Sequence, residues 1–336
     1  MIITRSPFRI PLGGGGTDLP SYYRNHGGFI FSAGIDKYMY ICLNQPIVDD
    51  LVRMKYSESE TVERTSQVKH ELAREAFRAL GIRNAVEVVS MADVPAGTGL
   101  GSSSCYLVGL LNALHTLKRD FISLHALAEE ACRIELEILK KPIGKQDQYL
   151  AAYGGFTALE IAKNGKVKVT AVKIPRKIID DLEKKMLIFY TGLSRSSLDI
   201  LAGQSTATRQ GNTVVLESLH KIKEIGYKVK EAIEKGDLTQ FGLLMDRHWQ
   251  VKKRLSTKIS NTHLDQIYRT AKKNGALGGK ITGAGGGGFF VFYCEDGAVR
   301  LRKAMEQLGL REMRYRFDFE GTKVISNFLN YRMDHS

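Results

Sequence analysis

Glycine is gathered into three short clusters in this 336-residue chain, at residues 13–16, 97–101 and 283–288. Each cluster interrupts a segment whose apolar pattern is otherwise regular. Glycine has no Cβ atom, so it lets the backbone adopt positive φ and approach a ligand closely. We therefore expect three loops at which the backbone itself comes near a ligand.

The middle cluster predicts a phosphate-binding loop. Its sequence, PAGTGLGSSS, occupies residues 95–104, and leucines recur at helical spacing directly after it. The start of such a helix presents free N–H groups and a positive dipole end to an anion, and three serines add hydroxyls for phosphate oxygens or Mg²⁺. A plain glycine turn with a serine N-cap is the alternative. Three alternate glycines followed by three serines favour phosphate, although no P-loop string GxxxxGK followed by Ser or Thr occurs.

The third cluster formally matches the dinucleotide fingerprint GxGxxG, through Gly283, Gly285 and Gly288. That fingerprint needs a strand before it and a helix after it. Here the strand-like run FFVFY follows instead. A Rossmann-type site is therefore excluded, which leaves either a hairpin loop or a backbone that approaches the ligand from a second domain.

Three carboxylates are candidates for chemistry. Asp18 ends the first cluster, where it is suited to accept hydrogen bonds from hydroxyl groups or to form an Asx turn. Glu135 lies on or beside the apolar face of an expected helix, four residues from Ala131 and three from Ile138. An inward carboxylate is costly unless it is paired or binds a metal, so a salt bridge and a Mg²⁺ site are both open. Asp147, in the string GKQDQY, is a candidate general base or a helix N-cap.

Helical and strand-like segments are mixed without regular βαβ repeats, which predicts an α+β protein. At about 150 residues for each domain, the length favours two domains, and we place them at residues 1–180 and 181–336. The expected strands are residues 2–12, 85–90, 186–190 and 289–294, and residues 29–43 are aromatic and β-branched, which is typical of a strand pair. The expected helices are residues 67–80, 102–118, 124–140, 214–234, 238–255, 263–275 and 296–308.

Positive charge is in excess, since 49 Lys and Arg against 36 Asp and Glu give a formal net charge of +13. Such a surface suits nucleic acid, or small phosphorylated ligands that are drawn into a cleft. The basic residues are scattered in short runs such as Lys252-Lys253-Arg254, which are typical of solvated helix faces. No RNA-binding or zinc-finger motif occurs. We therefore expect no nucleic-acid partner, with a basic nucleic-acid-binding protein as the non-enzymatic alternative.

The cysteines and the apolar runs bear on the compartment. The four cysteines are far apart and form no CxxC pair, so neither a zinc site nor a disulfide framework is indicated. No run approaches the roughly 20 apolar residues of a membrane-spanning helix, and the first residues do not resemble a signal peptide. We expect a cytoplasmic protein with no membrane partner.

All three glycine motifs resemble those of the GHMP kinases, the family of galactokinase, homoserine kinase, mevalonate kinase and phosphomevalonate kinase. Residues 95–104 match the second motif of that family, P-x-G-x-G-L-G-S-S-(S/A), at every position. Residues 9–18 have the spacing of the galactokinase-type signature R-x-x-L-x-G-x-x-T-D, and residues 280–288 resemble the third motif. The motifs occur in the order of the family along the whole chain.

The resemblance implies a fold and a set of roles. The fold is an N-terminal α/β domain, of a kind shared with a ribosomal protein, and a C-terminal ferredoxin-like domain. In this fold Ser103 and Glu135 would hold Mg²⁺, Asp147 would face the acceptor hydroxyl, and Arg9 would stabilise charge on the transferring phosphoryl group. The residues that the resemblance assigns to ATP are Pro95, Gly97, Thr98, Gly99, Leu100, Gly101, Ser102, Ser103 and Ser104.

The acceptor that the resemblance implies is a sugar. Galactokinases have Glu-His where this chain has Gly15-Gly16, whereas the strings LGGGGTDLP, GKQDQY and FYTGLSRSS look closest to the D-glycero-α-D-manno-heptose 7-phosphate kinases. That likeness implies transfer to the C1 hydroxyl, giving the 1,7-bisphosphate for GDP-heptose and surface polysaccharide synthesis; fucose, galactose and mevalonate are alternative acceptors. A homodimer is one of the states that the sequence allows. The residues assigned to the acceptor are Gly15, Gly16, Thr17, Asp18, Asp147, Arg195, Gly283, Gly285 and Gly286.

Overall fold

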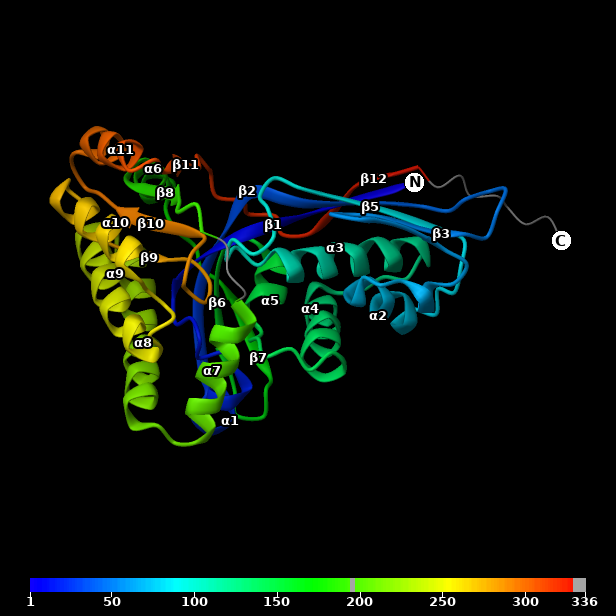
Figure 1. The fold of residues 1–336 in the computed structure, drawn as a ribbon, viewed down its shortest axis with the longest axis horizontal. Helices are drawn as coiled ribbons and strands as arrows, with labels where there is room; N and C mark the ends of the chain where they lie inside the picture. The colour runs from blue at the N-terminus through cyan, green and yellow to red at the C-terminus, as the bar shows by residue number, and fades with distance from the viewer. Residues whose placement is uncertain (194–196, 329–336) are drawn as a thin grey trace.

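The computed structural model describes residues 1–193 and 197–328, which fold around two β-sheets (Figure 1). Within these residues the larger sheet has eight strands, in the order β12-β1-β2-β5-β3-β4, with β6 paired to β2 and β7 paired to β6. Its strands are β1 (Ile2–Gly13), β2 (Gly28–Asn44), β3 (Val52–Lys55), β4 (Ser59–Val62), β5 (Val86–Ala92), β6 (Phe156–Ile161), β7 (Val167–Ala171) and β12 (Lys323–Asn327). The strands expected at residues 2–12 and 85–90 are confirmed, and residues 29–43 form one long strand.

Strand β2 organises this sheet because it is 17 residues long. Its first part pairs with β6 and its second part with β5, while β1 runs antiparallel along its length. Residues 28–35 are buried on both faces, whereas residues 39–44 alternate between buried and partly exposed. The sheet is therefore covered on both faces at the end of β1 that leads into the first glycine cluster, and on one face further away.

Most helices of the N-terminal half lie on one face of the larger sheet, where Figure 1 shows α2, α3 and α4 below the strands. Helix α3 packs directly on β1 and β2. These helices are α1 (Pro20–His26), α2 (Glu71–Ala79), α3 (Ser102–Leu117), α4 (Leu124–Cys132) and α5 (Gln146–Tyr153), with a 3₁₀ turn η1 (Thr65–Gln67). The helix expected over residues 124–140 continues past α4 as a π-helical segment, η2 (Arg133–Ile138).

The smaller sheet has the strand order β11-β8-β10-β9 within the described residues. Numbered along the chain this is 4-1-3-2 with antiparallel neighbours, the arrangement of a ferredoxin-like domain. The strands are β8 (Met186–Tyr190), β9 (Gly278–Ile281), β10 (Phe289–Tyr293) and β11 (Arg311–Glu312). The prediction of a ferredoxin-like C-terminal part is confirmed.

Helices of the C-terminal half connect the two sheets. Helix α8 packs on β1 and β2 of the larger sheet and also on α9, which in turn packs on β9. The helices are α6 (Arg176–Lys185), α7 (Ser197–Arg209), α8 (Thr213–Lys235), α9 (Leu238–Lys252), α10 (Thr262–Lys273) and α11 (Ala298–Gln307), with a 3₁₀ turn η3 (Lys253–Leu255). The chain then returns to the larger sheet, because β12 pairs with β1. The division at residues 1–180 and 181–336 stays a prediction.

Candidate active site

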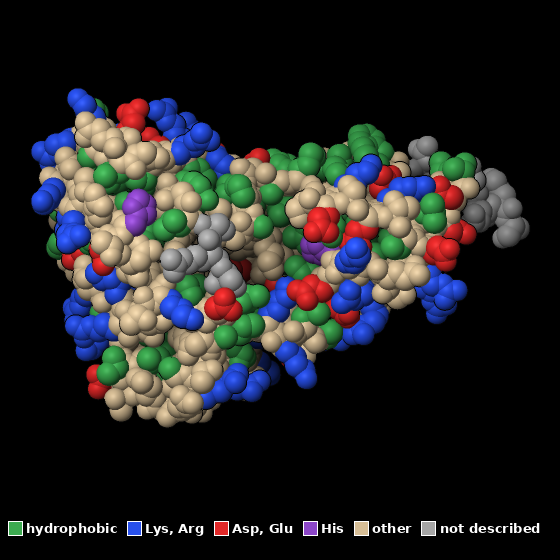
Figure 2. Space-filling model, viewed as in Figure 1, with side chains coloured by type: hydrophobic (Ala, Val, Ile, Leu, Met, Phe, Trp, Pro, Cys, Tyr) green, Lys and Arg blue, Asp and Glu red, His purple; other side chains and the backbone are tan. Residues whose placement is uncertain are grey.

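A cavity of about 340 Å³ lies where the three glycine clusters meet. Figure 2 shows the surface hollowed between the two halves of the molecule. Residues from both halves line the cavity, including helices α7 and α9. The predicted site residues that line it are Arg9, Gly15, Gly16, Asp18, Gly97, Gly99, Gly101, Ser102, Ser103, Ser104, Glu135, Asp147 and Gly283.

The remaining predicted residues that the structure describes are not part of this lining. Thr98 donates a hydrogen bond to the carbonyl of Pro95, and the Leu100 side chain is buried. Thr17 donates to carbonyls of Gly14 and Phe29, at 2.8 Å each, so it fixes the first loop from inside. Gly285 and Gly286 pack against Ile259. Arg195 lies outside the described residues.

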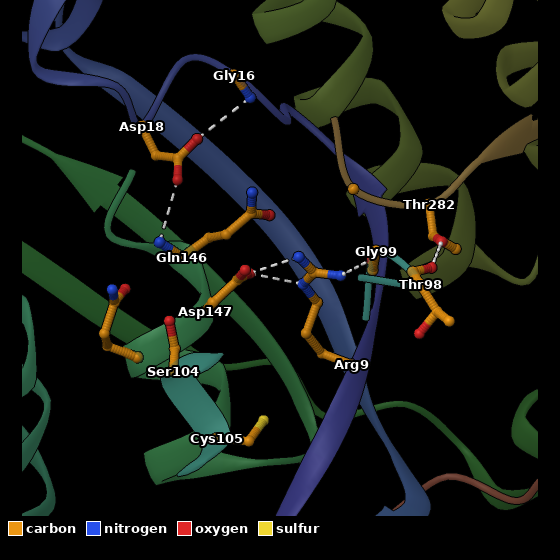
Figure 3. Close-up of polar contacts among 12 residues, drawn as sticks. Arg9, Gly16, Asp18, Thr98, Gly99, Ser104, Cys105, Gln146, Asp147 and Thr282 are labelled. Atoms are coloured by element: carbon orange, nitrogen blue, oxygen red, sulfur yellow. Dashed lines mark hydrogen bonds and ion pairs between the residues drawn. The ribbon is translucent and has the colours of Figure 1, made fainter. Parts of the chain in front are cut away.

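Arg9 and Asp147 both line the cavity and form an ion pair (Figure 3). Nε of the Arg9 guanidinium donates a hydrogen bond to Asp147 Oδ1 at 2.7 Å, and Nη2 lies 2.6 Å from the same oxygen as the ion-pair contact. The third nitrogen, Nη1, donates to the Gly99 carbonyl at 2.7 Å, so the buried guanidinium is held on two sides. Among the described residues, no group donates a hydrogen bond to Asp147 Oδ2, which lies beside Gly101. This oxygen is therefore free to accept a proton from a bound hydroxyl.

Glu135 belongs to η2, and its side chain lies beside the first residues of helix α3, directly after the middle glycine loop. Ser103 and Ser104 each donate to one of its carboxylate oxygens at 2.7 Å, and the Gln148 amide donates to Oε2 at 2.6 Å. The side chain is fully buried, and burial raises the pKa of Glu135 while these three hydrogen bonds lower it. The predicted inward direction of Glu135 is confirmed. Its partners are hydroxyl and amide groups, and no described basic group forms a salt bridge with it.

The Glu135 carboxylate and the Ser103 hydroxyl together fit a magnesium ion. Mg²⁺ prefers oxygen ligands and usually takes one or two carboxylates together with phosphate oxygens. A buried carboxylate whose ionised form lacks a cationic partner, with a serine hydroxyl 2.7 Å away, provides such donors. Among residues 1–193 and 197–328, no cluster of three or more His, Cys, Asp or Glu side chains is placed to hold a metal by itself. A metal here would therefore depend on the nucleotide for further ligands.

Asp18 is held by backbone amides at the other end of the cavity. Its carboxylate oxygens accept hydrogen bonds from the amides of Gly16 and Gln146, both at 3.1 Å. Burial raises the pKa of Asp18 to about 6, and the nearby Asp147 carboxylate adds to the rise. Gly144 makes room for this side chain, because a Cβ atom there would lie 1.9 Å from Asp18 Oδ2. The first motif is thereby joined to Gly144 and to the start of α5.

The second and third glycine clusters pack against each other. A Cβ atom on Gly283 would lie 2.8 Å from the Gly99 Cα atom, so both positions need glycine for this approach. Gly101 adopts a left-handed conformation with φ of 87° directly before α3, which aims the free amides of that helix at the cavity. The third cluster thus supports the middle loop from the C-terminal half.

Three basic residues of the cavity lie in the C-terminal half and were missed by the sequence analysis: His248, Lys252 and Lys280. Their exposed fractions are 1, 8 and 2%. The interpretation of the run at residues 252–254 as a solvated helix face is wrong for Lys252, which points inward. The signal that could have found it is the spacing of His248 and Lys252, four residues apart on the face that also carries buried Met245 and Trp249.

The comparisons with known proteins agree with this geometry. Residues 66–155 match the GHMP kinases N terminal domain family, and residues 229–309 match the GHMP kinases C terminal family. The D-glycero-alpha-D-manno-heptose 7-phosphate kinase of Campylobacter jejuni is 31% identical over 334 residues, which cover 96% of this chain and 97% of that relative.

Two further relatives share most of this chain. The crystal structure of a D-glycero-D-manno-heptose 1-phosphate kinase from Bacteroides thetaiotaomicron has a TM-score of 0.81 and 25% identity, and the match covers 98% of this chain and 100% of that one. The L-fucokinase/L-fucose-1-P guanylyltransferase of Bacteroides fragilis is 27% identical over 90% of this chain, but the match covers only 36% of that longer protein.

These relatives define the class of the protein, which is a phosphotransferase with a hydroxyl group as acceptor. The chain belongs to the GHMP kinases, and within this family it is a sugar kinase. The predicted family and the predicted α+β fold are both confirmed. Within the described ranges, no helix has both the length and the apolar character needed to cross a bilayer.

Proposed function

We propose that this kinase transfers the γ-phosphoryl group of ATP to the C1 hydroxyl of D-glycero-α-D-manno-heptose 7-phosphate, and that the product is the 1,7-bisphosphate. The phosphoryl-transfer step of this proposal is supported by the Arg9–Asp147 pair. One Asp147 carboxylate oxygen is held by Arg9, and the other faces the cavity. A base with one free oxygen beside a buried guanidinium suits phosphoryl transfer to a hydroxyl.

The nucleotide would bind at residues 95–104. The free amides at the start of α3, the backbone at Gly97, Gly99 and Gly101, and the serine hydroxyls offer hydrogen bonds to phosphate oxygens. Ser103 and Glu135 would hold Mg²⁺, which would neutralise charge on the phosphates when bound. The present hydrogen bond between these two side chains shows that their oxygens already lie together.

The chain's own residues then perform the transfer. Asp147 Oδ2 accepts the proton of the sugar hydroxyl, the hydroxyl oxygen forms a bond to the γ-phosphorus, and the bond from that phosphorus to the leaving oxygen of ADP breaks. Arg9 orients the carboxylate through a hydrogen bond and an ion-pair contact to Oδ1 and places positive charge beside the transferring group. Because phosphoryl transfer depends mainly on positioning and charge stabilisation, these two roles account for the chemistry asked of the protein.

The acceptor would lie between the first loop and the Asp147 carboxylate. Asp18, Gly15 and Gly16 line this part of the cavity, and the Asp18 carboxylate is suited to accept hydrogen bonds from sugar hydroxyls. Support for a heptose phosphate comes from the names of two relatives, which differ in the position of the phosphate, at C7 in one and at C1 in the other. We take the 7-phosphate as acceptor because that relative is the more similar in sequence, and we place the reaction in cytoplasmic GDP-heptose synthesis for surface polysaccharides.

A kinase screen with ATP and Mg²⁺ tests the proposal. The acceptors are D-glycero-D-manno-heptose 7-phosphate, the corresponding 1-phosphate, sedoheptulose 7-phosphate, fucose, galactose and mevalonate. We expect a bisphosphate by mass from the 7-phosphate, and ³¹P NMR should show one phosphate on the anomeric carbon. Preferred turnover of fucose, the acceptor suggested by the fucokinase relative, would reject the heptose assignment.

A further inference from the structure

The C-terminal wall of the cavity carries three buried basic side chains that the proposed reaction has not used. His248 and Lys252 lie one turn apart on α9, and Lys280 lies on β9 beside them. All three line the cavity and are more than nine-tenths buried. Buried charged side chains are ordinarily paired, yet none of the three forms a salt bridge with a carboxylate among the described residues.

The described hydrogen bonds of the two lysines are to backbone carbonyls and include no carboxylate. Lys252 Nζ donates to the carbonyls of Gly283 at 2.5 Å and Ile281 at 3.3 Å, and Lys280 Nζ donates to the Leu12 carbonyl at 3.1 Å. Neither ring nitrogen of His248 has a described hydrogen-bond partner. Burial lowers the pKa of Lys252 to about 7, and the positive charge of Arg9 adds to this effect. An anion between these groups would favour their protonated forms and satisfy their free donors.

The contacts of the cluster place it beside the reaction centre. Lys252 binds the carbonyl of Gly283, Gly283 touches Gly99, and the carbonyl of Gly99 accepts a hydrogen bond from Arg9. Lys280 binds the carbonyl of Leu12, directly before the first glycine loop. The cluster therefore lies between the middle and first glycine loops and lines the same cavity as Asp18, Glu135 and Asp147.

We propose that His248 and Lys252 form a phosphate-binding subsite on α9, with Lys280 supplying further positive charge behind them. The ligand class is a phosphate dianion. Under the proposed function, on which this assignment of source rests, the dianion is either the phosphate that the acceptor carries or the terminal γ-phosphate of ATP, which is the group to be transferred. Both have the same charge and the same acceptor oxygens.

Binding of inorganic phosphate tests the subsite without the reaction. The variants are Lys252→Met and His248→Leu, which remove the polar groups and largely keep the volume. The control is Lys253→Met, which removes the neighbouring charge that faces Asp265 at 3.5 Å. By isothermal titration calorimetry we expect at least tenfold weaker phosphate binding in both variants and less than twofold change in the control. Equal affinity in all four proteins, with unchanged near-UV circular dichroism, would overturn the subsite.

Steady-state kinetics then distinguishes the two sources. If the acceptor's phosphate binds here, Lys252→Met raises the KM for heptose 7-phosphate at least tenfold and leaves turnover of the unphosphorylated heptose unchanged. If the transferring group binds here, Lys252→Met lowers kcat at least tenfold for both acceptors. Absence of any heptose turnover by the unmodified protein would reject the proposed function, while the phosphate titration would still decide the subsite.

Discussion

Replacement of Asp147 by asparagine separates its role as a base from its role in an ion pair. Both contacts of Arg9 with Asp147 are to Oδ1 alone, namely the Nε hydrogen bond at 2.7 Å and the Nη2 ion-pair contact at 2.6 Å. The amide oxygen of an asparagine can take the place of Oδ1 in both contacts, while its NH₂ group replaces the free Oδ2. Asp147→Asn therefore keeps the geometry and removes the proton acceptor, whereas Asp147→Ala removes both.

The two variants should lose a similar factor in kcat but should differ in their free energy of unfolding. A positioned base contributes about 10²–10⁴-fold to kcat, or about 3–5 kcal/mol of transition-state stabilisation. Both variants should lose that factor, and the KM for ATP should stay within about threefold because other residues hold the nucleotide. Removing one partner of a buried ion pair costs about 3–5 kcal/mol of stability. We expect less than this range for Asp147→Ala, because Asp147 is one-quarter exposed and Arg9 keeps its bond to Gly99.

Turnover is measured by coupled ADP release, and the free energy of unfolding by urea denaturation. The control is Asp49→Asn, since Asp49 forms a two-point pair with Arg53 at 2.9 and 2.7 Å outside the cavity. Such a surface pair contributes about 1 kcal/mol or less, and its loss should leave kcat unchanged. The reasoning is refuted if Asp147→Asn keeps kcat within tenfold of the unmodified protein, or if the activity losses of the two Asp147 variants follow their stability losses.

Three further predictions concern the other carboxylates. Glu135→Gln should raise the Mg²⁺ concentration for half-maximal activity at least tenfold, because a metal ligand loses its charge; an unchanged Mg²⁺ titration excludes that role. Gly144→Ala should raise the KM for the sugar at least tenfold with little effect on ATP, since its Cβ would displace the Asp18 carboxylate; equal sugar KM values would contradict this. Burial raises the pKa of Asp18 from 3.8 to about 6, so the folded protein binds an extra proton between these pH values. The free energy of unfolding should therefore fall by about 3 kcal/mol as the pH rises from about 4 through 6, and urea denaturation should show this component in the unmodified protein but not in Asp18→Asn.

Local sequence patterns were sufficient to predict the three glycine loops. They also predicted that Glu135 points inward, because helical spacing fixes which side chains share a face. The hydrogen-bond partners of Glu135 could not be predicted in this way. The segment from Arg133 to Ile138 is π-helical, and helical periodicity in the sequence gives no sign of such a change. The shared contacts with Ser104 and Gln148 depend on how this segment packs on α3 and α5, so they appear only in the structure.

Helix α7 is an element that the sequence patterns did not predict. It was missed because its buried face carries Gln204, Ser205 and Thr208 next to Ile200, so no apolar stripe marks it. These residues are polar in sequence but lie on a face that packs near the cavity, where Gln204 approaches the carbonyl of Gly16. Lys252 is the opposite case, in which a run of basic residues resembles a solvated surface and one member is buried by contact with the third glycine loop.

The distribution of charge across the cavity explains why both halves of the fold are needed. The carboxylates Asp18, Glu135 and Asp147 all belong to the N-terminal half, where they suit hydroxyl groups and a metal, while Lys252 and Lys280 approach from the C-terminal half, where they suit phosphates. A phosphorylated sugar carries both hydroxyl and phosphate groups, so under the proposed function it would contact both walls. The two walls meet where Gly283 touches Gly99, and there a Cβ atom would lie within 3 Å of backbone. Glycine at these positions therefore sets the distance between the carboxylates and the lysines, and a larger residue at either one would force the two walls apart.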